Sequence, residues 1–201
     1  MREVRIYVEG GGNTEKTKEE CRRGFRTLLE KCGFEGKMPR IIACGSRREA
    51  YDRFKSAQRE SGGNYVALLV DSEDRIADIE KPWEHLEQRK DDNMPRPFGA
   101  TDEQAFLMVT CMETWIIADR DALKRHYGDK FQETALPALM DLEQRDRHAV
   151  QDALAHATRE CSNQYEKGKR SFRALSELTP ATLEICLPSF LRVRRILSEK
   201  I

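Results

Sequence analysis

The chain has 201 residues, of which 39% are hydrophobic and 35% are charged, and its 35 basic side chains balance 35 acidic ones. This length suits one domain, with or without an appendage, and the apolar content is sufficient for a packed core. The sequence shows no signal segment and no apolar run of membrane-spanning length, so we expect a cytoplasmic protein that does not contact a membrane.

The balanced total hides an uneven distribution of charge along the chain. Residues 16–48 contain ten basic and four acidic residues, residues 71–103 contain five basic and eleven acidic, and residues 167–201 contain eight basic and three acidic. Two basic regions that flank an acidic one suit a metal site acting on a polyanion. Taken alone, each region is more typical of ordinary solvated helix faces.

Apolar runs and amphipathic segments alternate over the first 120 residues. The runs predict strands over residues 6–8, 40–44, 65–70 and 105–111. Helices are predicted over 15–33, ending at Gly33, and from the cap residue Ser46 to about residue 60. Residues 71–101 contain three prolines and are predicted to form a long irregular loop. The alternation predicts an α/β fold, with a parallel sheet of about four strands and helices on both faces.

The rest of the chain is predicted to be helical. A helix starts at residue 114, with Trp115 in the core, and further helices begin at the cap residues Asp121, Asp146, Ser171, Thr179 and Ser189. We therefore expect an α/β domain over residues 1–128. Residues 129–201 would form a helical C-terminal region that packs on it as one compact unit.

Carboxylates follow the predicted strands. Glu9 and three glycines come directly after the first strand, Asp71 and Glu73 follow the third, and Glu113 follows the fourth. Because ligands bind beyond the carboxyl ends of parallel strands, Glu9, Asp71 and Glu73 converge if their strands are neighbours. Like charges at close range raise each other's pKa, and oxygen ligands suit hard cations. The pattern therefore predicts bound Mg²⁺ or Mn²⁺.

Other interpretations of these residues remain open. Glu15 stands where a phosphate-binding loop or a dinucleotide-binding turn requires glycine, which weighs against both. Asp71 could be the nucleophile of a phosphoaspartate phosphatase. Each carboxylate alone could also be a turn or helix cap. Six cysteines without a C-x-x-C pair indicate reduced core thiols, and the four histidines share no metal-ligand spacing.

Several motifs together resemble a bacterial family of Toprim-like domains. The matching stretches are residues 6–12, 21–25, 43–47, 68–73, 107–109, 112–115 and 165–168. The resemblance implies a Toprim-like sheet that binds Mg²⁺ through its acids and cuts or joins phosphodiesters. It relates the chain to the overcoming-lysogenization-defect nucleases. It also implies an ATPase encoded nearby and a role in phage defence.

The resemblance implies a role for each matching residue. Glu9 would be the general acid-base or first metal ligand, and Asp71, Glu73 and Glu113 would be metal ligands. Lys167 would stabilise the scissile phosphate. Glu15 and Asp119 are weaker candidates. Glu73 stands where many Toprim domains carry Asp, which leaves the number of metals open.

The sequence thus favours a metal-dependent nuclease, or nuclease subunit, that acts on DNA or RNA. The side chains expected to grip the nucleic-acid backbone are Arg22, Arg23, Arg26, Arg47 and Arg48. The alternatives are a phosphatase and a non-catalytic interaction subunit of an ATPase complex. A homo-oligomer is compatible with each of these three functions.

Overall fold

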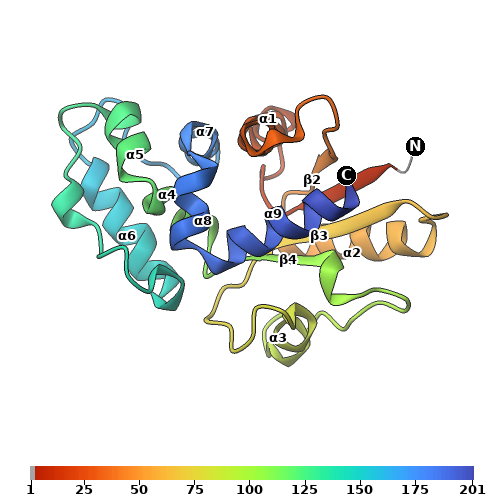
Figure 1. Ribbon diagram of the computed structural model, residues 1–201. Helices are drawn as coiled ribbons and strands as arrows, with labels where there is room; N and C mark the ends of the chain where they lie inside the picture. The colour runs from red at the N-terminus through yellow and green to blue at the C-terminus, as the bar shows by residue number, and fades with distance from the viewer. Residues whose placement is uncertain (1–2) are drawn as a thin grey trace.

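The fold is built on a sheet of four parallel strands in the order β2-β1-β3-β4. In the computed structural model, which describes residues 3–201, these strands are β1 (Val4–Val8), β2 (Arg40–Ala43), β3 (Tyr65–Asp71) and β4 (Ala105–Met108). Helices flank the sheet, and the C-terminal helix α9 crosses in front of it (Figure 1). The predicted α/β class and the parallel sheet of four strands are confirmed.

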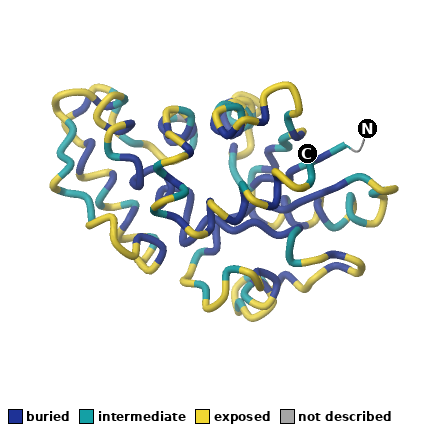
Figure 2. The backbone as a smooth tube through the Cα atoms, viewed as in Figure 1, coloured by how far each residue is buried: buried dark blue, intermediate teal, exposed yellow. Residues whose placement is uncertain are grey.

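Alternating side chains of the strands build two separate cores. Ile6, Val8 and Leu69 lie in one apolar cluster, with residues of α1 (Glu15–Leu29), α4 (Met112–Ala118) and α9 (Pro188–Lys200). Tyr7 and Leu68 lie in the other, with residues of α2 (Arg47–Arg59) and α3 (Pro82–Gln88). The sheet is consequently buried along most of its length (Figure 2). A strand buried on both faces needs a nearly continuous apolar run, as β3 has.

Helix boundaries follow the predicted caps in part. Thr14 and Ser46 accept hydrogen bonds from the N–H groups of Thr17 and Glu49, both at 3.2 Å, at the starts of α1 and α2. After α1 the chain continues in a π-helical segment, η1 (Glu30–Phe34), and turns out of it at Gly33, where φ is 91°. Helix α3 lies inside the stretch predicted to be irregular, so that prediction is wrong for residues 82–88.

The C-terminal half contains the expected helices, with shifted starts. They are α5 (Arg120–Tyr127), α6 (Arg147–Thr158), α7 (Lys169–Glu177), α8 (Pro180–Cys186) and α9; short 3₁₀ turns are η2 (Asp102–Gln104), η3 (Glu133–Ala135) and η4 (Leu142–Gln144). Asp146 caps α6 and Pro180 begins α8, as predicted. Three predicted caps are wrong, because Asp119 caps α5 in place of Asp121, and Ser171 and Ser189 lie inside the first turns of α7 and α9.

Helices on either side of residue 128 share one core. Helix α7 packs against α1 at Gly24, where an added Cβ would lie 2.6 Å from the carbonyl oxygen of Phe172. The rings of Phe25 and Phe172 lie 6.4 Å apart, and Trp115 is buried as expected. The glycine in the middle of α1 therefore permits the close approach of α7, which carries one wall of the candidate site.

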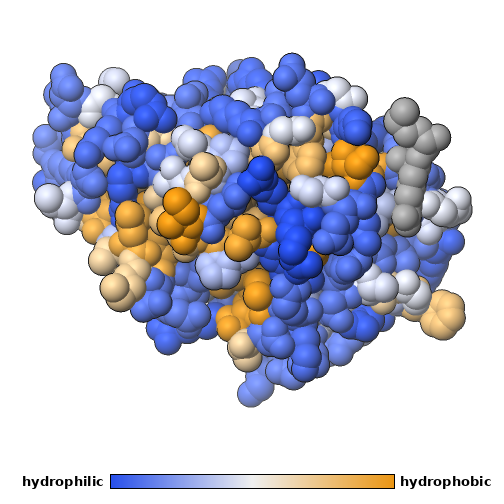
Figure 3. Space-filling view, in the orientation of Figure 1, coloured by the Kyte–Doolittle hydropathy of each residue, from blue (hydrophilic) through white to orange (hydrophobic). Residues whose placement is uncertain are grey.

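Apolar side chains are also exposed on one face. Figure 3 shows them gathered over α8 and the start of α9, on a face that is otherwise mostly hydrophilic, and Ile185 and Leu191 are among the exposed ones. Within residues 3–201, none of the helices combines the length and the apolar character that crossing a bilayer would require.

Candidate functional site

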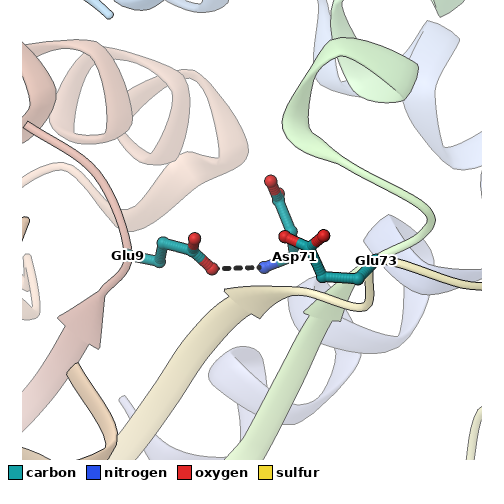
Figure 4. A group of neighbouring side chains, drawn as sticks. All are labelled: Glu9, Asp71 and Glu73. Atoms are coloured by element: carbon teal, nitrogen blue, oxygen red, sulfur yellow. Dashed lines mark hydrogen bonds between the residues drawn. The ribbon is translucent and has the colours of Figure 1, made fainter. Parts of the chain in front are cut away.

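The predicted carboxylates meet at the carboxyl ends of the two central strands, β1 and β3. Strand β1 pairs with β2 on one side and with β3 on the other, so the chain reverses its direction of winding between β1 and β3. This is the position where open α/β sheets bind ligands. Glu9, Asp71 and Glu73 lie there, and one carboxylate oxygen of each is within 4.8 Å of the others (Figure 4). The predicted convergence of these three residues is confirmed.

Glu9 and Asp71 are held by main-chain donors. The N–H of Asp71 donates to the Glu9 carboxylate at 3.2 Å, and Asp71 Oδ1 accepts from the N–H of Met112 at 2.8 Å. Burial raises the pKa of Glu9, although Arg47 opposes the rise. Burial, with the nearby charges of Glu9 and Glu113, raises the pKa of Asp71 well above its ordinary value. Among the described side chains, none forms an ion pair with either carboxylate, so burial outweighs the more distant cations.

Glu73 differs from the other two because a cation contacts it. Its main chain has a positive φ of 69°, and its N–H donates to the carbonyl of Thr110 at 2.8 Å. Its carboxylate forms an ion pair with Arg147, in the first turn of α6. A metal ligated by Glu73 would therefore compete with this guanidinium or share the carboxylate with it.

Glu113 lines the same cavity and is completely buried. Its carboxylate accepts hydrogen bonds from the Tyr165 hydroxyl at 2.7 Å and from the Gln151 side-chain amide at 3.3 Å. Both donors are neutral, so the carboxylate is satisfied without a counter-ion. It lies outside the group of three oxygens that could share one metal.

A cavity of about 320 Å³ opens beside the carboxylates. Glu9, Asp71, Glu113 and Lys167 line it together with five glycines and the side chains of Met108, Met112, Ser171 and Phe172. The charge of Lys167 lowers the pKa of both Glu9 and Asp71, in opposition to burial. Lys167 thus lies beside the acids, as the role implied for it requires.

The glycines after β1 are required by the fold of their turn. Gly10 and Gly45 exchange main-chain hydrogen bonds of 2.9 and 2.8 Å, which join the loops after β1 and β2. Gly11 has a φ of 87°, and an added Cβ there would lie 2.7 Å from Lys18 Cα. A Cβ at Gly45 would lie 2.7 Å from the carbonyl oxygen of Gly12. Side chains cannot occupy these positions, so bare main chain forms this wall of the cavity.

One family model spans this whole arrangement. A family described as a domain of unknown function, DUF4276, matches residues 8–197, which include every carboxylate of the site. The chain belongs to the DUF4276 family. No curated protein and no solved structure matches the chain. The DUF4276 assignment thus identifies the family but assigns no activity to the site.

Behind the site of this DUF4276 chain, an ionic network around the buried Arg47 holds the end of β3, which carries Asp71, and the loop after it, which carries Glu73. Arg47 donates to the main-chain carbonyl of Asp71 and forms an ion pair with Asp92. Arg89 pairs with Asp92 at 2.9 Å and with Asp74.

The next carbonyl of the same loop is also held. Arg89 donates to the carbonyl of Ser72 at 3.2 Å, and His85 donates to it at 2.9 Å. Arg47 was expected to grip nucleic acid, but it is buried and already bound to Asp71 and Asp92, so it positions the loop instead.

The other predicted residues lie outside the cavity lining. Glu15 is exposed and forms an ion pair with Arg22 at 2.6 Å. Arg23 and Arg26 are exposed on α1 and pair with Glu20 of α1 and with Glu30 at the start of η1. Arg48 is exposed and pairs with Asp52 at 3.2 Å.

Asp119 has a structural role in the described chain. It is buried, and its carboxylate accepts from the N–H groups of Ala122 at 3.0 Å and Thr179 at 2.8 Å. It thereby caps α5 and connects α8 to it. Its carboxylate oxygens are used in these hydrogen bonds, so Asp119 does not act as the metal ligand considered for it.

Sequence reasoning missed several residues that complete the site. They are Arg89, Asp92, Tyr165, Gln151 and Arg147. Arg89 and Asp92 lie in the acidic stretch after β3, where charge alone could not separate a buried pair from a solvated one. Tyr165 is two residues before Lys167, and an aromatic residue beside a glycine-flanked lysine was the only available signal.

Proposed function

We propose that this protein is a metal-dependent phosphodiester hydrolase that acts on nucleic acid. The observation that carries the proposal is the convergence of Glu9, Asp71 and Glu73, whose oxygens lie within 4.8 Å of one another at the centre of a parallel sheet. A strand ending in Glu-Gly beside a strand ending in Asp-x-Glu also resembles the arrangement of acids in Toprim domains. That likeness favours phosphodiester chemistry over other uses of a metal.

The residues present fit a hard divalent cation. All three donors are carboxylates, the ligand type that Mg²⁺ and Mn²⁺ prefer. Burial raises the pKa of Glu9, and burial with the charges of Glu9 and Glu113 raises the pKa of Asp71; a bound cation would offset these effects. Glu9, Asp71 and Glu73 would hold the ion. When bound, such an ion polarises a phosphoryl oxygen and lowers the pKa of coordinated water.

The chain's own groups would supply the remaining chemistry. Burial raises the pKa of Glu9, which suits this carboxylate to accept and return a proton. Lys167 places a positive charge on the cavity wall, where it would stabilise charge that develops on the phosphate. Arg47 fixes the main chain of Asp71 from behind, which keeps the carboxylate in place.

Two features argue against the phosphatase alternative. Asp71 is only 8% exposed, and its Oδ1 is engaged by the N–H of Met112. A nucleophilic aspartate must present an oxygen to the phosphorus atom, whereas a metal ligand is served well by a buried, oriented carboxylate.

The proposal is tested by incubating the purified protein with plasmid DNA and total RNA in Mg²⁺ or Mn²⁺, alone and with the ATPase proposed to be its partner. We expect cleavage that Glu9→Gln and Asp71→Asn reduce by at least about a thousandfold. Asp152→Asn is the matched control, since Asp152 is an exposed residue of α6.

Cleavage by Asp71→Asn at the wild-type rate would refute the proposed role of the acids. Covalent uptake of beryllofluoride by Asp71, without nucleic-acid cleavage, would favour the phosphatase.

A further inference from the structure

The cavity beside the carboxylates has an apolar part that phosphodiester hydrolysis does not need. Met108, Met112 and Phe172 line it together with Glu9, Asp71 and Lys167. The apolar side chains come from β4, α4 and α7, and the acids come from the ends of β1 and β3. With the proposed cation held by the acids, an occupant that satisfies the whole lining would carry a negatively charged group, which faces that cation and Lys167, and an apolar group next to it.

The size of the cavity limits that occupant. Its volume is about 320 Å³, and pockets that enclose small organic ligands range from about 300 to 1,000 Å³. This cavity is at the lower end of the range, so it suits one nucleotide unit and excludes a base pair with its stacked neighbours. A base in a duplex would have to leave the stack to enter it.

The main chain around the cavity leaves room for a flat group. A Cβ added at Gly168 would find no heavy atom of the described residues within 4 Å, and one at Gly12 would meet only Thr17 Oγ1 at 3.6 Å. Phe172, in contrast, is held in place, because it is buried in the core and its ring packs against that of Phe25. Aromatic rings and methionine sulfur both make favourable contacts with bases and other aromatic groups.

We propose that this cavity receives a single unstacked base adjacent to the scissile phosphate. The substrate is then single-stranded nucleic acid, or a duplex that contains unpaired bases. This inference rests on the proposed function, since the carboxylates mark where the phosphate binds. The base contacts Met112 and Phe172, and the bare main chain of Gly12 and Gly168 gives it space.

The first test compares three substrates of the same sequence in Mn²⁺ with the wild-type protein. They are a single strand, a blunt duplex and a duplex with one bulged nucleotide. An unpaired base avoids the cost of unstacking, so we expect the single strand and the bulged duplex to be cut at least about tenfold faster than the blunt duplex. Equal rates on the blunt duplex and the single strand would overturn the inference and leave the nuclease intact.

The second test removes the apolar contact. In Met112→Ala the main-chain N–H that donates to Asp71 is retained. We expect this variant to bind a single-stranded oligonucleotide roughly three- to tenfold more weakly. It should also lose the fluorescence change of a 2-aminopurine base, measured in Ca²⁺. Met94→Ala is the matched control, because Met94 is fully buried in the core on the other face of the sheet.

The outcomes separate the two proposals. If no substrate is cut, the proposed function fails, and a 2-aminopurine response that Met112→Ala abolishes still supports the base-binding cavity. If wild type cuts nucleic acid but shows no 2-aminopurine response, the base-binding cavity is refuted. Melting temperatures of both methionine variants show whether each is folded when it is assayed, and the three-substrate comparison needs no variant.

Discussion

Two groups of charged side chains lie on opposite sides of the loop that follows β3. In front, Glu9 and Asp71 contact main-chain N–H groups, and among the described side chains neither forms an ion pair within 4 Å. Behind, Asp92 is bound by both Arg47 and Arg89. The two groups adjoin each other, since Arg47 donates to the carbonyl of Asp71. The Asp92 carboxylate is nevertheless paired with cations, whereas the carboxylates of Glu9 and Asp71 are not.

The difference separates a structural network from the site that we propose to bind a cation. Burial opposes ionisation in both groups, but Arg47 and Arg89 hold the pKa of Asp92 below its ordinary value. Burial and like charges raise the pKa of Asp71. Carboxylates that are clustered and outside ion pairs do not stabilise a fold, which supports the cation site that we propose at the sheet's switch point.

Breaking the balanced network should have the largest effect on stability. We expect Arg47→Met to lower the free energy of unfolding by about 1–3 kcal/mol, because it leaves the Asp71 carbonyl without its donor and leaves Asp92 with Arg89 as its remaining partner. The neighbouring Arg48→Met should change it by less than about 0.5 kcal/mol, since Arg48 is exposed. Urea unfolding of both variants measures the two values. Equal values for the two variants would mean that the network contributes no stability.

The carboxylates of Glu9 and Asp71, which form no ion pair among the described side chains, should make the metal-free stability depend on pH. The raised pKa of Asp71 means that the folded state binds a proton which the unfolded chain has released above about pH 4. Metal-free stability should therefore fall as the pH rises through this window, and Asp71→Asn should remove part of the fall. Melting curves in EDTA between about pH 4 and pH 8 test this. Parallel curves for the two proteins at every pH would contradict it.

Exposed charges on α1 should have the smallest effect. Arg22 and Arg23 each pair with an acid of α1 and Arg26 pairs with Glu30 at the start of η1, so a nucleic-acid phosphate must displace an existing partner. Their joint replacement by Ala should reduce the salt dependence of nucleic-acid binding by about one log–log unit for each phosphate that the protein no longer neutralises. The exposed pair Arg125 and Lys130 serves as the control. An unchanged slope in the triple variant would place the nucleic acid elsewhere.

The same comparison explains what could be predicted from the sequence. Strand-end carboxylates are visible because an apolar run stops at a charged residue, and parallel strands bring such ends together, so Glu9, Asp71 and Glu73 were found. The role of Arg47 was predicted wrongly, since it was expected to bind nucleic acid and instead bonds Asp71 and Asp92. Its partner Asp92 is 45 positions away, and a helix-start arginine looks the same whether it is buried or exposed.

Local structure was predictable where one signal dominated. The apolar runs located all four strands, whereas α3 was missed because nearby prolines masked a short helix. Ser171 and Ser189 resemble caps in sequence. In the structure the Ser171 hydroxyl accepts from the N–H of Gly168, and Ser189 is buried against Trp115. These choices depend on tertiary packing, which single residues do not encode.

The most direct test of the central claim is calorimetric titration of Mn²⁺ into wild type, Asp71→Asn and Asp92→Asn. Both variants remove one acid by the same substitution, one from each side of the loop. We expect Asp71→Asn to lose Mn²⁺ binding and keep or raise its metal-free melting temperature, and Asp92→Asn to keep Mn²⁺ binding and melt at a lower temperature. Mn²⁺ uptake by Asp71→Asn equal to that of wild type would contradict the account.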